Sequence, residues 1–332
     1  MVLMYFKKGK VSNKGKTLPE KLDEGPQEPI KPPPPAHHLK PFIDKISIVV
    51  SFPDDEEAKL IYKAIHKYEN DPAVFVYAGP KTKWGKFNFA KRIPLTKSSQ
   101  QPLFQAESKF TKTSKIRLEF NPRKVGADGL VELHFILSCL IDNGWDCLLQ
   151  YGKITRLDIA VDIPNVRPGA FAILPQQGLT TKLWAVDGQL ETFTLGKPHG
   201  NQTLLYNKKK KRLSQKQTWV GPATTRVERR LRNPSNSSLK DLPKVANPFH
   251  ALNLVQVPDD APGDESQSWV WDLFKAAVAV HNLPAALALV PKERRTKYRA
   301  HLEKHKHELW DADAIWNNWP AALSELKMHI PK

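Results

Sequence analysis

Short runs of β-branched, aliphatic and aromatic residues recur along the chain from residue 45 onward, and several of them alternate with polar positions. Runs of this kind, bounded by polar or turn-forming residues, are typical of β-strands. The predicted strands cover residues 46–50, 73–77, 115–120, 154–161, 191–195, 203–206 and 226–231. Two stretches with helical spacing, residues 54–70 and 129–143, lie between them, and the first opens with acidic residues that suit a helix N-terminus.

Strands mixed with a few helices predict an α+β fold, with a mainly antiparallel sheet, flanking helices and a small helical C-terminal region. Residues 1–44 are rich in lysine and proline and poor in large apolar side chains, which predicts a disordered tail. We expect the principal domain at residues 45–246, a linker at residues 247–267 and helices at residues 268–332. No internal repeat is evident in the sequence.

The net charge of the chain indicates which kind of partner it binds rather than how it folds. The chain has 51 lysine and arginine residues against 34 acidic residues, a formal net charge of +17. A basic surface of this size attracts polyanions, and DNA or RNA is the expected one. We find no run of 18 apolar residues, no apolar signal-peptide core and no sustained basic amphipathic helix, which argues against a membrane. The two cysteines are too few for a disulfide framework, so we expect a cytoplasmic protein.

A pattern of arginine, aliphatic residue and acid recurs in three predicted strands. The three copies are Arg117-Leu118-Glu119, Arg156-Leu157-Asp158 and Arg226-Val227-Glu228. Residues two apart in a strand share a face, so each strand presents an arginine and a carboxylate together, and Asp162 extends the second strand's polar face. Two interpretations stay open. The pattern is either a ladder of cross-strand ion pairs or an acid cluster that holds a divalent metal for phosphoryl transfer.

Tyr206 lies at the end of a predicted strand, followed by Asn207 and the basic run at residues 208–212. A tyrosine in this position is usually a core aromatic with its hydroxyl in water. Nearby ammonium groups would lower the cost of a phenolate and hold a phosphate backbone beside it, which would make Tyr206 a usable nucleophile.

Histidines and a second basic stretch are weaker signals. His305 and His307 are spaced like a metal pair on a strand, but their segment reads as helical, where residues two apart do not face each other, so we expect them to be solvated. A basic stretch in the C-terminal region fits either a helix that contacts a DNA groove or a solvated surface helix. Its members are Lys292, Arg294, Arg295, Lys297 and Arg299.

Five short motifs occur in a defined order between about residues 45 and 235. They are Ile116-Arg-Leu-Glu-Phe-Asn-Pro122, Ile154-Thr-Arg-Leu-Asp158, a Thr-x-x-Leu-Gly turn ending at Gly196, Leu204-Leu-Tyr-Asn-Lys208 and Thr225-Arg-Val-Glu-Arg229. In this order they resemble rolling-circle replication initiators, specifically the filamentous-phage initiator and the plasmid replication initiation factors that lack the paired-histidine metal motif.

The resemblance implies a DNA nickase that cuts a plasmid or phage origin. Its tyrosine nucleophile, which maps onto Tyr206, would form a 5′-phosphotyrosyl DNA intermediate and free a 3′-hydroxyl primer. Arg156 and Arg226 would steady the phosphate, and Lys208 would lie beside the nucleophile. A divalent metal, Mg²⁺ or Mn²⁺, would be held by four acids. These acids are Asp158 and Glu228, with Glu119 and Asp162 as weaker candidates.

The resemblance also implies partners. The origin DNA, double- and single-stranded, is the expected substrate, and a host helicase, a polymerase and self-association are left open. The alternative from a different class is a noncatalytic DNA- or RNA-binding protein, in which the same sheet is a basic docking face and the acids only orient the arginines.

Overall fold

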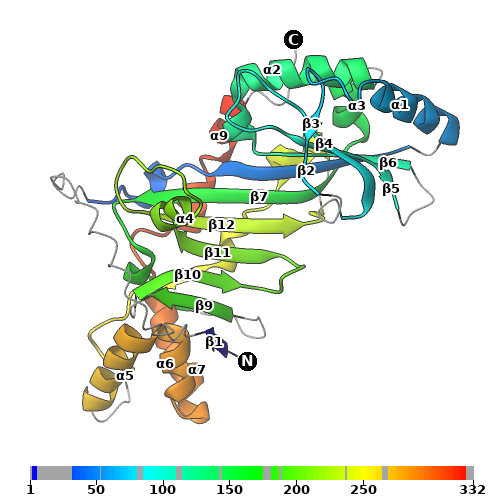
Figure 1. Ribbon diagram of the computed structural model, residues 1–332. Coiled ribbons are helices and arrows are strands. Elements are labelled where there is room, and N and C mark those ends of the chain that lie inside the picture. The colour runs from blue at the N-terminus through cyan, green and yellow to red at the C-terminus, as the bar shows by residue number, and fades with distance from the viewer. Residues whose placement is uncertain are drawn as a thin grey trace, which may run out of the picture.

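The computed structural model describes residues 2–5, 32–52, 54–80, 85–109, 114–141, 144–174, 181–186, 189–235, 238–263 and 268–326. Within these residues, one large sheet of 11 strands forms the centre of the molecule, and helices pack around it (Figure 1). Its strands are β1 Val2–Tyr5, β2 Phe42–Phe52, β3 Val76–Tyr77, β4 Phe87–Arg92, β5 Leu103–Ser108, β6 Ser114–Phe120, β7 Lys153–Pro164, β9 Thr181–Val186, β10 Gln189–Leu195, β11 Gln202–Asn207 and β12 Thr224–Arg232.

The pairs of neighbouring strands are antiparallel, except that β1 runs parallel to β9. A second, two-stranded sheet pairs β8 (Ala172–Leu174) with β13 (Asn253–Val255). The helices are α1 Asp55–Lys67, α2 Pro122–Leu140, α3 Gly144–Tyr151, α4 Lys208–Ser214, α5 Ser268–His281, α6 Leu283–Leu289, α7 Lys292–Lys304, α8 Ala312–Trp316 and α9 Trp319–Leu326. The predicted α+β fold with a mainly antiparallel sheet is therefore confirmed.

Local signals explain where the first helices begin. Asp54 caps α1 by accepting a hydrogen bond from the Glu56 backbone N–H (2.8 Å), and Asn121 caps α2 by accepting one from Lys124. Pro122 occupies the first turn of α2, where its missing N–H costs nothing. Residues 73–77 were predicted as a strand, but a turn occupies residues 72–74, and only Val76–Tyr77 pair with β4.

The order of strands in the sheet repeats in two halves. From β2 outward the order is β2, β6, β5, β4 and β3, and from β7 outward it is β7, β12, β11, β10 and β9. In each half the first strand along the chain pairs with the last, and the remaining strands follow in reverse order. Because β2 and β7 are antiparallel neighbours at the centre, the two halves are related by an approximate twofold axis through the sheet. The sequence had shown no repeat.

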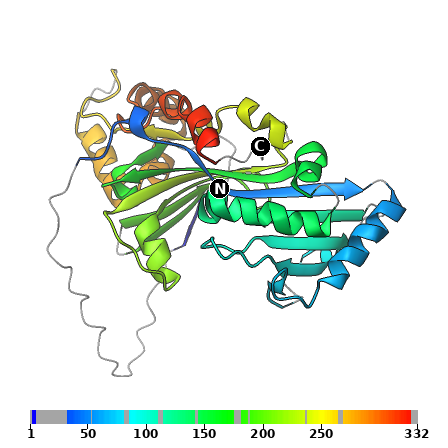
Figure 2. The same cartoon turned by 90° about the horizontal axis from the view of Figure 1, so that it is seen from above.

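The two faces of the central strands differ sharply in polarity. One face of β7 carries Leu157, Ile159 and Val161, which are fully buried, and Val227 of β12 lies with them. These side chains join the main hydrophobic core, to which α2, α3 and α9 contribute. The other face is polar and is partly covered by α4. Figure 2 shows α4 and the C-terminal helices α8 and α9 on opposite sides of the sheet.

The predicted domain boundaries need two corrections. Residues 32–44 are not a free tail, because Leu39 and Ile43 are buried in the main core and Asn318 donates hydrogen bonds to the His37 and Leu39 carbonyls. Val2–Tyr5 form β1, whereas residues 6–31 of the predicted tail lie outside the described residues. The predicted linker is likewise packed, since Phe249 is fully buried in the main core. Residues 264–267 of the linker are not described.

The C-terminal helices belong to two different cores. Trp310, Ile315 and Trp319, in and around α8 and α9, are buried in the main core. Helices α5 to α7 instead form a second core, in which Trp271 and Tyr298 are buried against β8 and β13. Figure 1 shows α5, α6 and α7 together at the lower end of the molecule.

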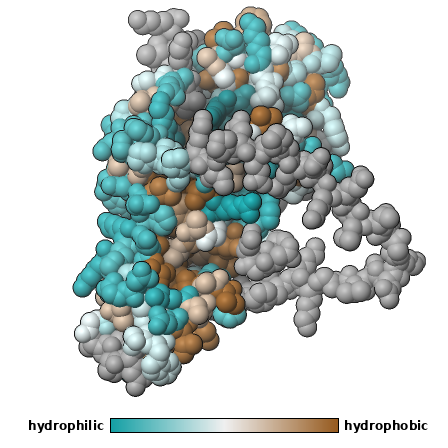
Figure 3. Space-filling model, turned by 90° about the vertical axis from the view of Figure 1, so that its left-hand side faces the viewer, coloured by the Kyte–Doolittle hydropathy of each residue, from teal (hydrophilic) through white to brown (hydrophobic). Residues whose placement is uncertain are grey.

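On the side shown in Figure 3, apolar side chains gather in a patch near the middle, with polar side chains above and below it. Among the described helices, none combines the length and the apolar character needed to cross a bilayer.

A prediction concerns the turn between β10 and β11. Gly196 has a φ of +104°, and a Cβ atom there would lie 2.3 Å from the Asn201 carbonyl oxygen. Gly196→Ala should therefore lower the free energy of unfolding by at least about 2 kcal/mol, measured by urea denaturation. Gly200→Ala is the matched control, because its Cβ would meet neighbours only at 3.8 Å. Equal free energies of unfolding for the two variants would contradict the conclusion that only glycine fits this turn without strain at position 196.

Candidate active site on the polar face of the sheet

The three arginine-aliphatic-acid motifs lie on the same face of the same sheet. Strands β7 and β12 pair directly, β2 lies between β7 and β6, and the register aligns the polar residues of all three motifs. Arg226 pairs with Asp162 across β7 and with Tyr206 across β11, while Arg230 pairs with Asp158. We call the following residues the polar face: Asp44, Lys45, Ser47, Gln105, Arg117, Glu119, Arg156, Asp158, Asp162, Tyr206, Arg226, Glu228 and Arg230.

Tyr206 and Glu228 form a buried pair at one end of the polar face. The Tyr206 hydroxyl donates a hydrogen bond to Glu228 Oε2 at 3.0 Å, and the two residues are only 4% and 1% exposed. The Lys211 Nζ lies 3.9 Å from the centre of the tyrosine ring. Burial, and then the negative charge of Glu228, raise the pKa of Tyr206 well above its usual value. The neighbouring lysines therefore do not make this phenol acidic, contrary to the sequence-based expectation.

Glu228 is held as a carboxylate by cations on its other side. Arg230 Nε donates to Glu228 Oε1 at 2.7 Å. Burial on its own would raise the pKa of Glu228, but the charge and hydrogen bond of Arg230, together with Lys211, more than offset it, so the pKa is lowered. Glu228 is thus ionised and accepts the tyrosine hydroxyl proton as a hydrogen bond.

Arg226 connects two elements that are far apart in the sequence. Its Nε and Nη2 donate to the Asp162 carboxylate at 2.6 and 2.9 Å, and its Nη1 donates to Asp44 Oδ1 at 2.7 Å. The guanidinium also lies over the Phe42 ring, 4.9 Å from its centre. Asp44 and Phe42 come from the first strand of the other half, so Arg226 joins the two halves at the centre of the sheet.

Asp158 and Asp162 differ in their electrostatic environment although both lie on β7. Burial raises the pKa of Asp158, with a further contribution from the charge of Glu228, and Arg156 compensates only in part. Burial would also raise the pKa of Asp162, but hydrogen bonds and charges from Arg226 and Lys208 reverse the sign, so its pKa is lowered. Lys208 Nζ donates to Asp162 Oδ2 at 2.5 Å.

Glu119 lies in the other half of the sheet. It pairs with Lys45 (3.1 Å) and with Arg117, whose guanidinium also donates to Gln105 Oε1 at 2.9 Å. Gln105 on β5 is the cross-strand partner of Arg117, just as Tyr206 on β11 is the partner of Arg226. The approximate twofold therefore pairs the Tyr206 position with a glutamine, and only one half of the sheet carries a tyrosine at this position.

The four carboxylates predicted as metal ligands are all engaged by cationic side chains. Arg156 and Arg230 hold Asp158, Arg226 and Lys208 hold Asp162, Arg230 holds Glu228, and Lys45 and Arg117 hold Glu119. Within the described part of the chain, these acids do not form a group of three or more whose ligand atoms all lie within 4.8 Å of one another. In this arrangement they do not fit a divalent metal, which would have to displace the arginines.

Helix α4 covers part of the polar face. Asn207 caps it through a hydrogen bond from Lys210 N (3.1 Å), and none of its seven residues is buried. Three lysines fix α4 to the sheet. Lys208 forms an ion pair with Asp162, Lys210 forms one with Glu191, and the Lys211 ammonium lies over the Tyr206 ring. Because none of its residues is buried and its contacts are mainly between charged groups, α4 opens more easily than the elements that contribute to the hydrophobic core.

The sequence missed several members of this site. Asp44 was placed in the tail, and Lys211 was counted only as part of a basic run. Arg230 could have been found, because it continues the alternation of Arg226 and Glu228 by two residues. The C-terminal basic stretch is less uniform than expected, because Arg295 donates to the Ala288 and Val290 carbonyls (both 2.8 Å) and so caps the end of α6.

No protein-family profile and no curated protein matches the chain. Among solved structures, the di-domain ARO/CYC BexL from the BE-7585A biosynthetic pathway is similar over 79% of this chain and 98% of that chain. The sequence identity is 12% and the TM-score is 0.16, so this likeness carries no argument about fold or function.

A prediction follows from the lowered pKa of Asp162. Asp162→Asn leaves the Lys208 ammonium without its carboxylate and Arg226 with Asp44 alone, so the free energy of unfolding at pH 7 should fall by about 3 kcal/mol. Because the pKa of Asp162 is lower in the folded state, the ionised carboxylate stabilises the fold fully at any pH above its unfolded-state pKa of about 3.9. This stabilisation is lost as the pH falls through the folded-state pKa. The gap between the wild type and the variant should therefore narrow below about pH 4. Asp128→Asn, at an exposed position on α2, is the control. A gap that does not change with pH would contradict the assignment.

Proposed function

We propose that the protein is a DNA strand transferase that nicks a replication origin with Tyr206 as its nucleophile, and so initiates rolling-circle replication of a plasmid or phage. The observation that carries the proposal is the hydrogen bond from the Tyr206 hydroxyl to the Glu228 carboxylate, inside a cluster of arginines and lysines. A cytoplasmic location and the origin DNA as partner are part of this proposal.

The chemical step is a transesterification. The Tyr206 oxygen attacks the phosphorus of a DNA phosphodiester, and its proton passes to Glu228 Oε2, to which it is already hydrogen-bonded. The bond between phosphorus and the 3′ oxygen breaks, and that oxygen takes up a proton from solvent to become the 3′-hydroxyl. One phosphoester bond forms as one breaks, so the 5′-phosphotyrosyl intermediate retains the bond energy for rejoining. The high pKa of the phenol makes a nearby base necessary.

Cationic side chains supply the electrostatic stabilisation in this proposal. Over the whole polar face, cations outnumber carboxylates once Lys208 and Lys211 of α4 are included, so this face has positive charge left for a phosphate. The cations are Lys45, Arg117, Arg156, Lys208, Lys211, Arg226 and Arg230, and the carboxylates are Asp44, Glu119, Asp158, Asp162 and Glu228. Guanidinium groups fixed by carboxylates are already oriented for a pentacoordinate phosphate, which is the preorganisation that makes such stabilisation effective. No step is assigned to a metal at these acids.

Access to Tyr206 requires α4 to move, since the tyrosine is only 4% exposed. The lysines that hold α4 on Asp162 and Glu191 are the groups that a DNA backbone attracts. Phosphates that compete for these lysines would free α4 and open the tyrosine, so the structure corresponds to the closed state of the proposed enzyme.

Tyr206→Phe tests the nucleophile directly. The variant should lose cleavage of a supercoiled plasmid carrying its own origin, and labelled oligonucleotide should no longer become covalently attached, whereas DNA affinity should stay within about twofold. Removing the hydroxyl keeps the ring and its packing, so the fold is expected to persist. Tyr77→Phe, at a side chain that is 73% exposed, controls for loss of a tyrosine hydroxyl elsewhere. Cleavage by Tyr206→Phe at the wild-type rate would rule out this nucleophile.

Glu228→Gln tests the proton acceptor. A positioned general base contributes on the order of 100-fold or more, so the rate of adduct formation should fall by at least about that factor and recover as the pH is raised. Glu119→Gln is the corresponding change in the other half of the sheet, where Gln105 occupies the tyrosine position, and it should reduce the rate far less. Equal losses in both variants would assign the acids a purely structural role.

A second function is favoured by one observation. Every carboxylate of the polar face orients a cation, which also suits a noncatalytic protein that binds DNA or RNA on a basic sheet. Binding without any phosphotyrosyl adduct, on single-stranded oligonucleotides from its own replicon, would select this second function.

A further inference from the structure

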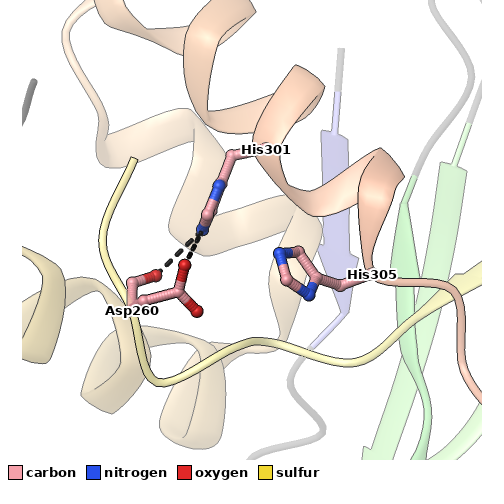
Figure 4. A group of neighbouring side chains, drawn as sticks. All are labelled: Asp260, His301 and His305. Carbon is pink, nitrogen blue, oxygen red and sulfur yellow. Dashed lines mark hydrogen bonds and ion pairs between the residues drawn. The ribbon is translucent and has the colours of Figure 1, made fainter. Parts of the chain in front are cut away.

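His301, His305 and Asp260 converge at the end of α7, away from the polar face in the fold. Each offers one ligand atom, and these three atoms all lie within 4.8 Å of one another. His301 Nε2 is 2.9 Å from the Asp260 carbonyl oxygen and 3.9 Å from its Oδ2. Figure 4 shows the two rings and the carboxylate turned toward a common point between α7 and the loop that carries Asp260.

The sequence spacing explains how one helix presents both rings. His301 and His305 are four residues apart, so they lie on the same side of the last turn of α7. His305 is the C-cap residue that directly follows Lys304, and its ring centre is 5.0 Å from that of His301. From the sequence we expected His305 and His307 to be solvated rather than paired on a metal. In the structure, His307 packs against Phe171, and His305 lies beside His301.

The backbone around this cluster is fixed on both sides. On the helix, Tyr298 and Leu302 are 2% and 0% exposed in the second core. On the loop, the Trp271 indole donates to the Pro258 carbonyl at 3.0 Å, two residues before Asp260. Trp271 also packs on His301, with ring centres 5.4 Å apart, so the same tryptophan positions the loop and one imidazole.

We propose that His301, His305 and Asp260 form a binding site for a Zn²⁺-class divalent transition-metal ion. Two imidazoles and one carboxylate are a common zinc donor set that leaves a fourth position for water. Zinc–ligand bonds of about 2.0–2.1 Å place neighbouring ligand atoms about 3.4 Å apart. The present separations, at most 4.8 Å, need to shrink by no more than about 1.4 Å, and the Asp260 side chain, 73% exposed, can rotate toward the ion. Imidazole donors select zinc over Mg²⁺, which prefers oxygen ligands.

The bound ion would connect the loop at Asp260 to α7. These segments border the second core of α5 to α7, which has no disulfide, since Cys139 and Cys147 are both free and lie in α2 and α3. Metal binding to the folded state alone raises its stability. A bound ion would therefore stabilise the C-terminal helical region. This site is independent of the function proposed for Tyr206.

Zinc binding by the full-length protein tests this site. The apoprotein should bind one Zn²⁺ per chain in competition with a chromophoric chelator, and Co²⁺ should give the visible absorption bands of a four-coordinate site. His305→Ala and Asp260→Asn should each weaken Zn²⁺ binding by at least about 10- to 100-fold. Asp260→Asn changes an exposed side chain, so it reports on the site even where loss of a ring affects folding.

His281→Ala is the matched control, because it removes an exposed histidine from the last turn of α5. A second control removes His37 and His38, two exposed neighbouring histidines whose ring centres lie 4.2 Å apart and which could compete for the ion. Both controls should bind Zn²⁺ as the wild type does. Retained affinity in His305→Ala and Asp260→Asn, or loss of affinity in the His37/His38 variant, would overturn the proposed site.

Discussion

The hydrogen bond between Tyr206 and Glu228 is the interaction on which the account of this protein depends. It forms in a setting where burial raises the pKa of the phenol and Arg230 and Lys211 keep the carboxylate ionised. A neutral donor and a charged acceptor are thus held together in a nearly dry site, where such a bond is strong. The same burial that stabilises this pair hides the tyrosine from a substrate, so any reaction has to begin with movement of α4.

The two halves of the sheet show what distinguishes the proposed active half. Both halves place an arginine and a glutamate on the last strand, at Arg117 and Glu119 in one and at Arg226 and Glu228 in the other. The strand next to it supplies Gln105 in the first half and Tyr206 in the second. The repeated scaffold therefore accounts for two of the three copies of the motif, those on β6 and β12, while the difference between Gln105 and Tyr206 accounts for where the chemistry is proposed. The arginine ladder is a feature of the fold, and the tyrosine is the feature specific to one site.

Much of the sheet could be predicted from the sequence, because its central strands largely alternate between apolar and polar residues. The motif spacing also placed Arg156, Asp158, Arg226 and Glu228 on one face. The sequence could not show which residues distant along the chain meet in the fold. Asp44 reaches Arg226 because β2 lies beside β7. The direction of the Tyr206 pKa shift could not be predicted either. Burial and the charge of Glu228 on the neighbouring strand raise this pKa, and the lysines close in sequence do not offset them. His301 and Asp260 are 41 residues apart and meet only in the folded chain, where Trp271 contacts both the His301 ring and the loop before Asp260.

The most direct test of the central claim is to locate the covalent bond itself. The protein is incubated with a single-stranded oligonucleotide from its own replicon, digested with trypsin and nuclease, and the modified peptide is sequenced by mass spectrometry. We expect a nucleotide attached through its 5′ phosphate to Tyr206. Attachment to any other residue, or the absence of an adduct under conditions in which the DNA is bound, would contradict this expectation.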